Sequence, residues 1–255
     1  MTQSIQPYVA GITERLLRDA GIAPGMRVLD IGCGRGDVSL LAASLVGATG
    51  HVLGVDRDAE AIAVARSRAG DLRCTHADFA AEDISALPET LGPFDAIVGR
   101  RVLMYQPDPV ATVQSVCRLL RAGGLLVLQE HDATMVPGRR VPLPLHERVN
   151  RWMWDTVQRD GGTPHMGFDL HAVLSRAGLL VEHVRAEAIV QTPTAHHDVT
   201  AMFRANLPRV VRHGIATEAE IGVDTLHDRL VEERVTAGAT YIGDMAFGAW
   251  ARKAA

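Results

Sequence analysis

Short apolar runs alternate along the first half of the chain with segments in which apolar residues recur every three or four positions. The runs are typical of strands buried on both faces of a parallel sheet, and the three-to-four spacing is typical of helices that pack against such a sheet. This alternation predicts an α/β fold with a doubly wound, Rossmann-like, mostly parallel sheet, because right-handed crossovers place helices on both faces. We expect strands at 28–31, 51–55, 72–76, 94–98 and 125–129, and helices at 8–20, 38–45, 59–69 and 109–120.

The pattern changes after Glu130. The segment that follows holds prolines, histidines and two tryptophans, and a later segment is helical and polar in character. We expect a helix at 169–177 and strands at 179–190 and 240–251, which complete a seven-stranded sheet. The predicted organisation is a single domain, 1–255; a ligand-binding core, 21–130; and two helical inserts after strands five and six, 131–165 and 194–237.

Composition excludes several functional classes. The net charge is −4 and no run of basic residues occurs, so we expect neither a nucleic acid nor an anionic membrane as partner. No apolar stretch approaches the ~18 residues that span a bilayer. Cys33, Cys74 and Cys117 are odd in number and far apart, which indicates free thiols in a reducing compartment and no metal site. The first residues lack the pattern of a secretory signal, so we expect a cytoplasmic protein.

The most specific segment is Val28-Leu29-Asp30-Ile31-Gly32-Cys33-Gly34-Arg35-Gly36-Asp37. Glycines in a strand-to-helix turn let the backbone approach a ligand, and the helix that follows offers unpaired amides to a phosphate or a carboxylate. A dinucleotide site is one interpretation, and Asp56 has the acidic spacing for it. The spacing of the glycines argues against it, as does Asp30, because a carboxylate there suits a cation better than a pyrophosphate.

This segment resembles motif I of the class I S-adenosylmethionine-dependent methyltransferases, which has the form (V/L)LD(I/V)GCGxG. The family's other landmarks follow in order, from about residue 7 to residue 130. Beyond that the chain more loosely resembles bacterial small-molecule methyltransferases with a helical insert. The landmarks are Val52-Leu53-Gly54-Val55-Asp56, His76-Ala77-Asp78-Phe79, Phe94-Asp95-Ala96-Ile97-Val98 and Leu119-Leu120-Arg121-Ala122-Gly123-Gly124, where Ala122 replaces the usual proline of a turn.

The resemblance implies S-adenosylmethionine as cofactor, held by residues 21–130. It implies that Asp56 binds the ribose hydroxyls and that Asp78 accepts a hydrogen bond from the adenine amine. Arg57 and Phe79 would flank the adenine ring. Asp30 would lie near the positive charge of the ligand, or could instead organise the loop. The full set of expected cofactor-binding residues is Asp30, Gly32, Cys33, Gly34, Asp56, Arg57, Asp78, Phe79 and Arg100.

The acceptor is expected beyond strands four and five, beneath the inserts. His131 follows strand five directly and is the leading general base, with Glu130 or Asp132 expected to orient it; Tyr105 is a second catalytic candidate. Trp152 and Trp154 cannot share a helix face, so one should be core and the other should line the pocket. The expected substrate-binding residues are Arg101, Tyr105, His131, Trp152 and His165, with Met135, His146, Trp154, His196, His197, Phe203 and Arg204 as further candidates.

The sequence therefore predicts transfer of a methyl group from S-adenosylmethionine to O, N or C of a small metabolite, by a monomer or homodimer. An alternative is an enzyme of the same fold that binds S-adenosylmethionine but does not methylate. A third possibility is a nicotinamide-dependent oxidoreductase, which would respond to nicotinamide cofactors in a thermal-shift assay.

Overall fold

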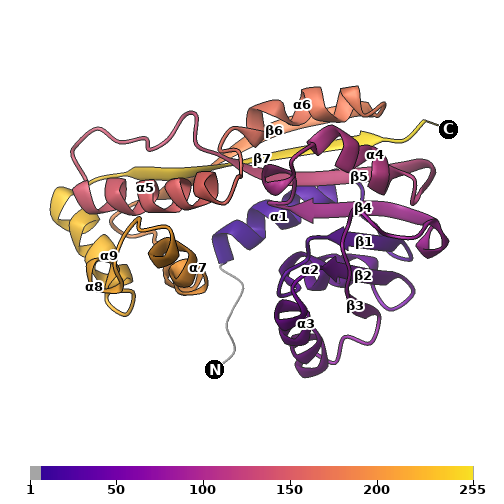
Figure 1. The fold of residues 1–255 in the computed structure, drawn as a ribbon, viewed down its shortest axis with the longest axis horizontal. Coiled ribbons are helices and arrows are strands. Elements are labelled where there is room, and N and C mark those ends of the chain that lie inside the picture. Colours follow the sequence, from indigo (N-terminus) through magenta and orange to yellow (C-terminus); the bar gives the residue numbers. More distant parts are fainter. Residues whose placement is uncertain (1–6, 255) are drawn as a thin grey trace.

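The computed structural model describes residues 7–254 (Figure 1). Residues 1–6, on which the expectation about a secretory signal rests, lie outside the described residues, as does residue 255. The strands are β1 Arg27–Ile31, β2 His51–Asp56, β3 Ala77–Ala81, β4 Phe94–Arg100, β5 Leu120–Asp132, β6 Leu180–Gln191 and β7 Tyr241–Arg252. The helices are α1 Pro7–Asp19, α2 Asp37–Val46, α3 Ala59–Asp71, α4 Pro109–Cys117, α5 Pro144–Arg159, α6 Met166–Arg176, α7 Thr200–Arg212, α8 Glu218–Ile221 and α9 Leu226–Ala237.

The seven strands form one sheet in the order β3-β2-β1-β4-β5-β7-β6. The first five strands are parallel, whereas β7 runs antiparallel to both β5 and β6. The order in which successive strands are added to the sheet reverses between β1 and β4. A ligand crevice is therefore expected beyond the carboxyl ends of these two strands. The predicted fold class is confirmed.

Helices cover both faces of the sheet. On one face α1, α2 and α3 pack through Leu16, Leu45 and Ile62 against strand residues such as Val52 and Val127. On the other face α4 and α6 supply a second apolar core, in which Val113, Val116 and Leu170 meet Ile97 and Leu126. Alternate residues of each strand serve the two cores, because successive side chains point to opposite faces. The strands are therefore packed on both faces, and this packing fixes the positions of the residues at their ends.

The third strand was predicted five residues too early. Helix α3 continues to Asp71, and the chain then turns through Arg73, which has a positive φ of 52°. Leu72 is 61% exposed at this turn, so its apolar character does not mark a strand. Strand β3 begins at Ala77, and Asp78 therefore lies inside the strand rather than beyond its end.

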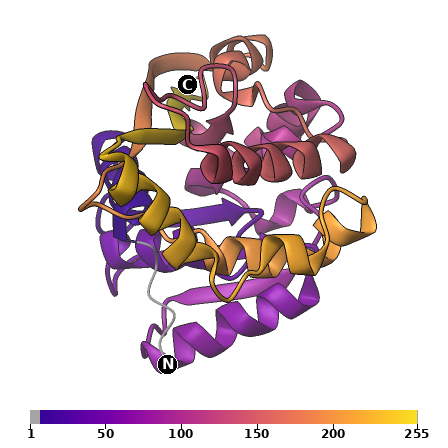
Figure 2. The same cartoon turned by 90° about the vertical axis from the view of Figure 1, so that its left-hand side faces the viewer.

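The two inserts fold into one cap at the end of the sheet to which β5 and β7 extend (Figure 1). Helix α5 comes from the first insert, and α7, α8 and α9 come from the second. Seen from that side, the helices of residues 200–237 lie across the front of the sheet (Figure 2). The cap has its own apolar cluster, made by Leu145, Val149, Trp152, Phe203, Val210, Ile221, Leu226 and Leu230.

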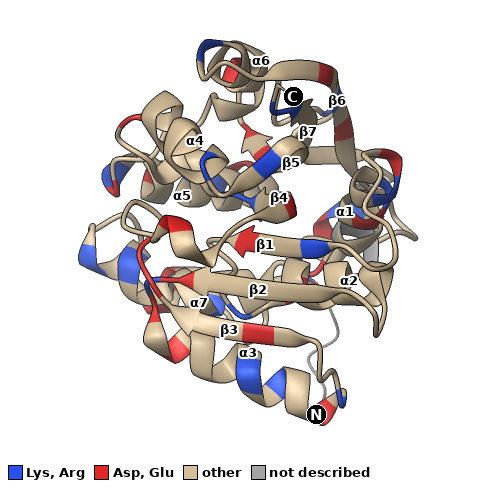
Figure 3. Cartoon of the chain, turned by 90° about the vertical axis from the view of Figure 1, so that its right-hand side faces the viewer, with Lys and Arg blue, Asp and Glu red and all other residues tan. Residues whose placement is uncertain are grey.

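Charged residues of both signs are interspersed on the face that Figure 3 shows. No helix within residues 7–254 combines the length and the hydropathy needed to cross a membrane.

Candidate active site

The loop between β1 and α2 is shaped by its glycines. Gly32, Gly34 and Gly36 have φ values of 62°, 52° and 81°, a region that residues with a Cβ rarely adopt. A Cβ built on Gly34 would meet no atom within 4 Å, so open space adjoins the backbone there. Cys33 is buried, and its amide donates to the Val55 carbonyl at 3.0 Å. This loop fits a ligand that lies against the Gly34 backbone.

Asp30 is the last polar group of β1 and is only 1% exposed. Its Oδ2 accepts a hydrogen bond from the Ser39 hydroxyl at 2.5 Å, whereas Oδ1 is buried without a partner. Burial raises the pKa of this carboxyl to about 7, against the hydrogen bond from Ser39, which lowers it. A buried carboxylate with an unpaired oxygen is suited to a cationic group of a ligand.

Asp56 ends β2 beside the glycine loop. Its Oδ2 accepts from the Gly34 amide at 2.8 Å, and its Oδ1 accepts from the Asp58 amide at 2.9 Å. Asp58, not Asp56, caps α3, by accepting from the amides of Glu60 and Ala61. Each Asp56 oxygen keeps a second lone pair, so the carboxylate can hold the loop and also accept from a pair of ligand hydroxyls.

Two of the predicted adenine contacts are wrong. Asp78 pairs with His51 at 2.9 Å, at the opposite end of the sheet from the Asp56 tip. Phe79 is 5% exposed, and its ring supports Gly36 and Gly54 from inside the fold, so it offers no free face for stacking. Both errors follow from the misplaced third strand.

The acidic residues beyond the carboxyl end of β3 are instead Glu82 and Asp83. The Glu82 amide donates to the Asp56 carbonyl, which brings this segment beside the β2 tip. The Ser85 backbone amide and hydroxyl lower the pKa of Asp83, and Arg57 lowers it further. Asp83 and Arg57 are thus near the same corner as Asp56. The Asp-x-Ser turn at 83–85 was the sequence signal that could have indicated this.

A cavity of about 390 Å³ runs from the glycine loop to the cap. Its cofactor side is lined by Arg35, Asp37, Arg68 and Arg100, and its acceptor side lies beneath α5, α7 and α9. Arg100 donates to Asp37 at 3.3 Å and to the Thr13 hydroxyl at 3.3 Å. Burial lowers the pKa of Arg100, but Asp37 opposes this shift.

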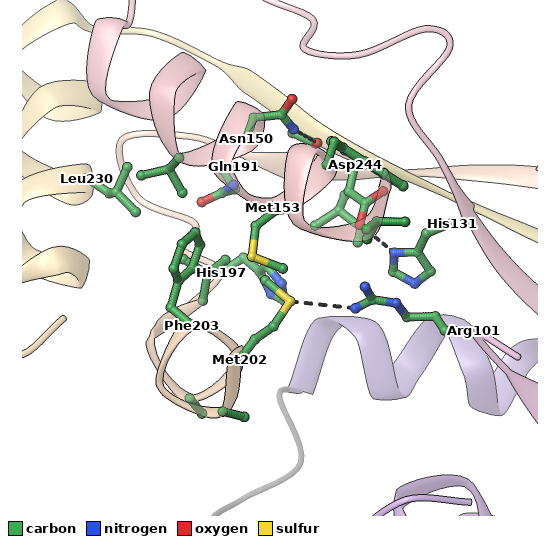
Figure 4. A pocket seen from close by; sticks show the side chains of 18 of the residues that line it. Arg101, His131, Asn150, Met153, Gln191, His197, Met202, Phe203, Leu230 and Asp244 are labelled. Atoms are coloured by element: carbon green, nitrogen blue, oxygen red, sulfur yellow. Dashed lines mark hydrogen bonds and ion pairs between the residues drawn. The ribbon is translucent and has the colours of Figure 1, made fainter. Parts of the chain in front are cut away.

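His131 and Asp244 meet in the cavity (Figure 4). His131 is 5% exposed at the end of β5, and its Nδ1 pairs with Asp244 Oδ2, which comes from the antiparallel β7. Nε2 is buried without a partner. The prediction that Glu130 or Asp132 orients the ring is wrong.

Glu130 and Asp132 instead hold backbone segments next to the cavity. Glu130 accepts from the amides of Val102 and Leu103 at 2.9 and 2.8 Å, and burial raises its pKa to about 7. Asp132 accepts from the amides of Thr134 and Phe168.

The structure shows which of the other acceptor candidates line the cavity. Trp152 packs on Phe203 in the cap core and does not line the cavity, whereas Trp154 lines it. The tryptophan on the pocket side is therefore Trp154 and not Trp152. His165 is exposed and bonds Thr134, away from the cavity. Tyr105 hydrogen-bonds Arg101 and does not line the cavity either. The candidates that line the cavity are Arg101, His131, His146, Trp154, His197 and Phe203.

A buried polar network that the sequence did not reveal ties the cap together. Arg234 is 1% exposed and donates to His146 Nε2 at 2.7 Å and to His196 Nδ1 at 2.9 Å. Glu233 accepts from His146 Nδ1 at 2.6 Å and from the first amides of α5. Such long-range pairings leave no local sequence signal. Within residues 7–254 no cluster of three or more histidine, cysteine or acidic side chains could hold a metal ion.

Comparison with known proteins identifies the class. Residues 22–178 match a family model described as a methyltransferase domain, so the chain belongs to that family. The resemblance to class I S-adenosylmethionine-dependent methyltransferases, and S-adenosylmethionine as cofactor of this family, are confirmed.

The similar proteins have varied names. An arsenite methyltransferase of Aquipseudomonas alcaligenes is 36% identical over 50% of this chain and 37% of its own length. A ubiquinone biosynthesis O-methyltransferase of Aromatoleum aromaticum is 38% identical over 42% of this chain and 44% of its own length. The chain thus spans less than half the length of these curated relatives. The crystal structure of the [4+2]-cyclase SpnF, 20% identical, covers 99% of this chain and 84% of its own, with a TM-score of 0.60, and shows the shared fold.

Proposed function

We propose that the protein binds S-adenosylmethionine at the carboxyl ends of β1, β2 and β4 and transfers its methyl group to O, N or C of a small metabolite under the cap. One observation carries this proposal: a single cavity joins Arg100 and Asp37 beside the glycine loop to His131 beneath the cap. Methyl transfer needs donor and acceptor aligned in one space, and this cavity offers a continuous space for both.

The chain's own residues fit the parts of the donor. The Gly34 backbone borders open space, Asp56 presents acceptors for the ribose, and Asp30 offers a buried oxygen to the positive charge. Arg57 and Asp83 are placed to border the adenine. S-adenosylmethionine would supply an activated methyl group on a sulfonium.

His131 is the proposed general base, because it lines the cavity and its Nε2 has no hydrogen-bond partner among the described residues. Arsenite, which one relative's name carries, is not favoured here. Arsenic(III) prefers thiolate ligands, and none of Cys33, Cys74 and Cys117 lines the cavity. We also propose a cytoplasmic monomer or homodimer that acts on neither nucleic acid nor membranes.

The test has two parts. Calorimetric titration with S-adenosylhomocysteine should show binding, and nicotinamide cofactors should not shift the melting temperature. Candidate acceptors are then screened by mass spectrometry for the gain of one methyl group, with S-adenosylhomocysteine measured in parallel. An acceptor converted without S-adenosylhomocysteine accumulating would favour the non-methylating alternative. Absence of S-adenosylhomocysteine binding would refute the proposed function.

A further inference from the structure

The acceptor side of the cavity holds polar atoms that the fold leaves unpaired. His131 Nδ1 pairs with Asp244 Oδ2, and a carboxylate accepts from the protonated ring nitrogen, which leaves a lone pair on Nε2 whenever the ring is neutral. This Nε2 and Asp244 Oδ1 are both buried without partners. Buried polar atoms are ordinarily hydrogen-bonded, so the site fits a ligand that donates to His131.

Arg101 brings a positive charge to the same place. It has a φ of 59°, which is uncommon for a residue with a side chain, and its amide bonds the Gln129 carbonyl at 2.8 Å. Its guanidinium contacts the Met202 sulfur at 3.6 Å and hydrogen-bonds Tyr105. Among the described residues no carboxylate forms an ion pair with it, although it faces the cavity (Figure 4).

The guanidinium is charged. Burial alone would lower the pKa of Arg101, but Tyr105 and Asp244 outweigh this effect and raise it. Arg101 is half-buried, and a guanidinium in such a position without an ion-pair partner is well placed to bind an anionic group of a ligand.

The rest of the acceptor side is mainly apolar. Its wall includes Val149, Met153, Trp154, Val157, Ile189 and Phe203. Figure 4 shows Arg101 and His131 together on one side of the cavity, with Phe203 and Leu230 toward the other. The site therefore matches an apolar body with a polar head.

We propose that the acceptor is an apolar molecule with an acidic hydroxyl of the phenol or enol kind, that Asp244 positions His131 to remove its proton, and that Arg101 binds the resulting oxyanion. This inference rests on the proposed function. The O–H proton passes to His131 Nε2, and the oxygen lone pair forms the new O–CH₃ bond. The S–CH₃ bond breaks with its electron pair going to sulfur, which leaves neutral S-adenosylhomocysteine and a protonated His131 that returns its proton to solvent.

Other acceptors fit less well. An amine that is protonated at neutral pH would be repelled by Arg101. An aliphatic alcohol is too weak an acid for an imidazole to ionise, because general-base catalysis is efficient when the two acidities are close. A carboxylate needs no base at all, so it would leave the His131–Asp244 pair without a role.

The test uses 7-hydroxycoumarin, whose phenolate absorbs at longer wavelength than the phenol, with saturating S-adenosylhomocysteine. Asp244, His197 and Arg101 are charged or titratable groups on the acceptor side with His131, and Asp37, Arg100, His146 and Tyr241 also line the cavity. The bound probe should ionise about one pH unit or more below the free probe, the effect of a nearby opposite charge. The shift should shrink in Arg101→Met, Asp244→Asn and His131→Ala. Arg204→Met, an exposed residue of α7 paired with Asp224, is the matched control and should keep it.

Coumarin itself, which has no hydroxyl, should bind every variant equally, so a merely structural defect would be seen as lost coumarin binding. The proposal is overturned if the probe ionises as it does in free solution, if the shift persists in Arg101→Met, or if the wild-type protein does not bind the probe. Calorimetry with S-adenosylhomocysteine on the same samples separates failure of the proposed acceptor class from failure of the proposed function. Intact S-adenosylhomocysteine binding with no shift refutes only the acceptor class.

Discussion

The ionisation of Asp30 should control how tightly the cofactor binds. This carboxyl is buried, and its pKa is raised to about 7, so the free protein holds it mostly protonated at pH 6. The proposed ligand carries an ammonium and a sulfonium, and either would favour the ionised form through the unpaired Oδ1. Cofactor binding should therefore release a proton from Asp30 and become tighter as the pH rises.

The pKa fixes the size of the effect. With a value of about 7, roughly one tenth of the Asp30 side chains are ionised at pH 6 and roughly nine tenths at pH 8. If only the ionised form binds well, the affinity rises about tenfold over this range, or about 1.4 kcal/mol. In the free protein the raised pKa of Asp30 also affects the stability of the fold, which falls as the pH rises, whereas cofactor affinity increases. The native state binds the proton more tightly than the unfolded chain, so this carboxyl lowers stability as pH rises from about 4 through 7.

The assay is calorimetric titration at pH 6, 7 and 8, in two buffers of different ionisation enthalpy so that released protons are counted. The ligands are S-adenosylmethionine, which carries both cations, and S-adenosylhomocysteine, which keeps only the ammonium. Asp30→Asn keeps an oxygen for Ser39 and should bind weakly with a flatter pH dependence. Because ionisation of the ligand itself is common to both proteins, the difference between them isolates Asp30. Glu130 also titrates near pH 7, but it is unchanged in the variant. Equal slopes in the wild-type and Asp30→Asn proteins would refute the reasoning.

Three further changes test the site. Asp56→Ala should weaken S-adenosylhomocysteine binding by roughly 1–3 kcal/mol, because a charge-assisted acceptor and the Gly34 contact are lost; unchanged affinity by calorimetry would remove Asp56 from the site. Gly34→Val should abolish binding in a folded protein, because a β-branched residue resists a φ of 52° and its side chain fills the adjoining space; the check is a circular dichroism spectrum together with the titration. His131→Ala should lower kcat ~10²–10⁴-fold and remove the acid limb of the pH–rate profile at saturating cofactor; near-wild-type turnover at every pH would indicate catalysis by alignment alone.

The succession of strands and helices along the chain was predictable because each apolar run is a local feature of the sequence. The exception, β3, shows the limit of that signal. Leu72 belongs to a turn in which Arg73 adopts a positive φ, and nothing in the local sequence marks that turn. The strand itself, Ala77–Ala81, has no β-branched residue to mark it. The error then placed Asp78 and Phe79 at a strand end where neither lies.

The cofactor loop was also predictable, since its residues follow one another along the chain. The acceptor side was not, because its pairs are far apart in sequence. His131 and Asp244 are brought together only by the antiparallel register of β5 and β7. Arg234 reaches His146 and His196 through helix packing in the cap. Neither contact follows from spacing or periodicity.

The position of β7 has a consequence for biosynthesis. It is the last strand to leave the ribosome, yet it lies between β5 and β6 in the sheet. Until it is made, the nascent chain presents two unpaired strand edges, one of them on β5, which is buried over most of its length in the finished fold, and exposed edges favour association between chains. The five parallel strands and their glycine loop precede it, so the residues of the proposed cofactor side are all made before β7. His131 would acquire Asp244 as its partner only after β7 has been made.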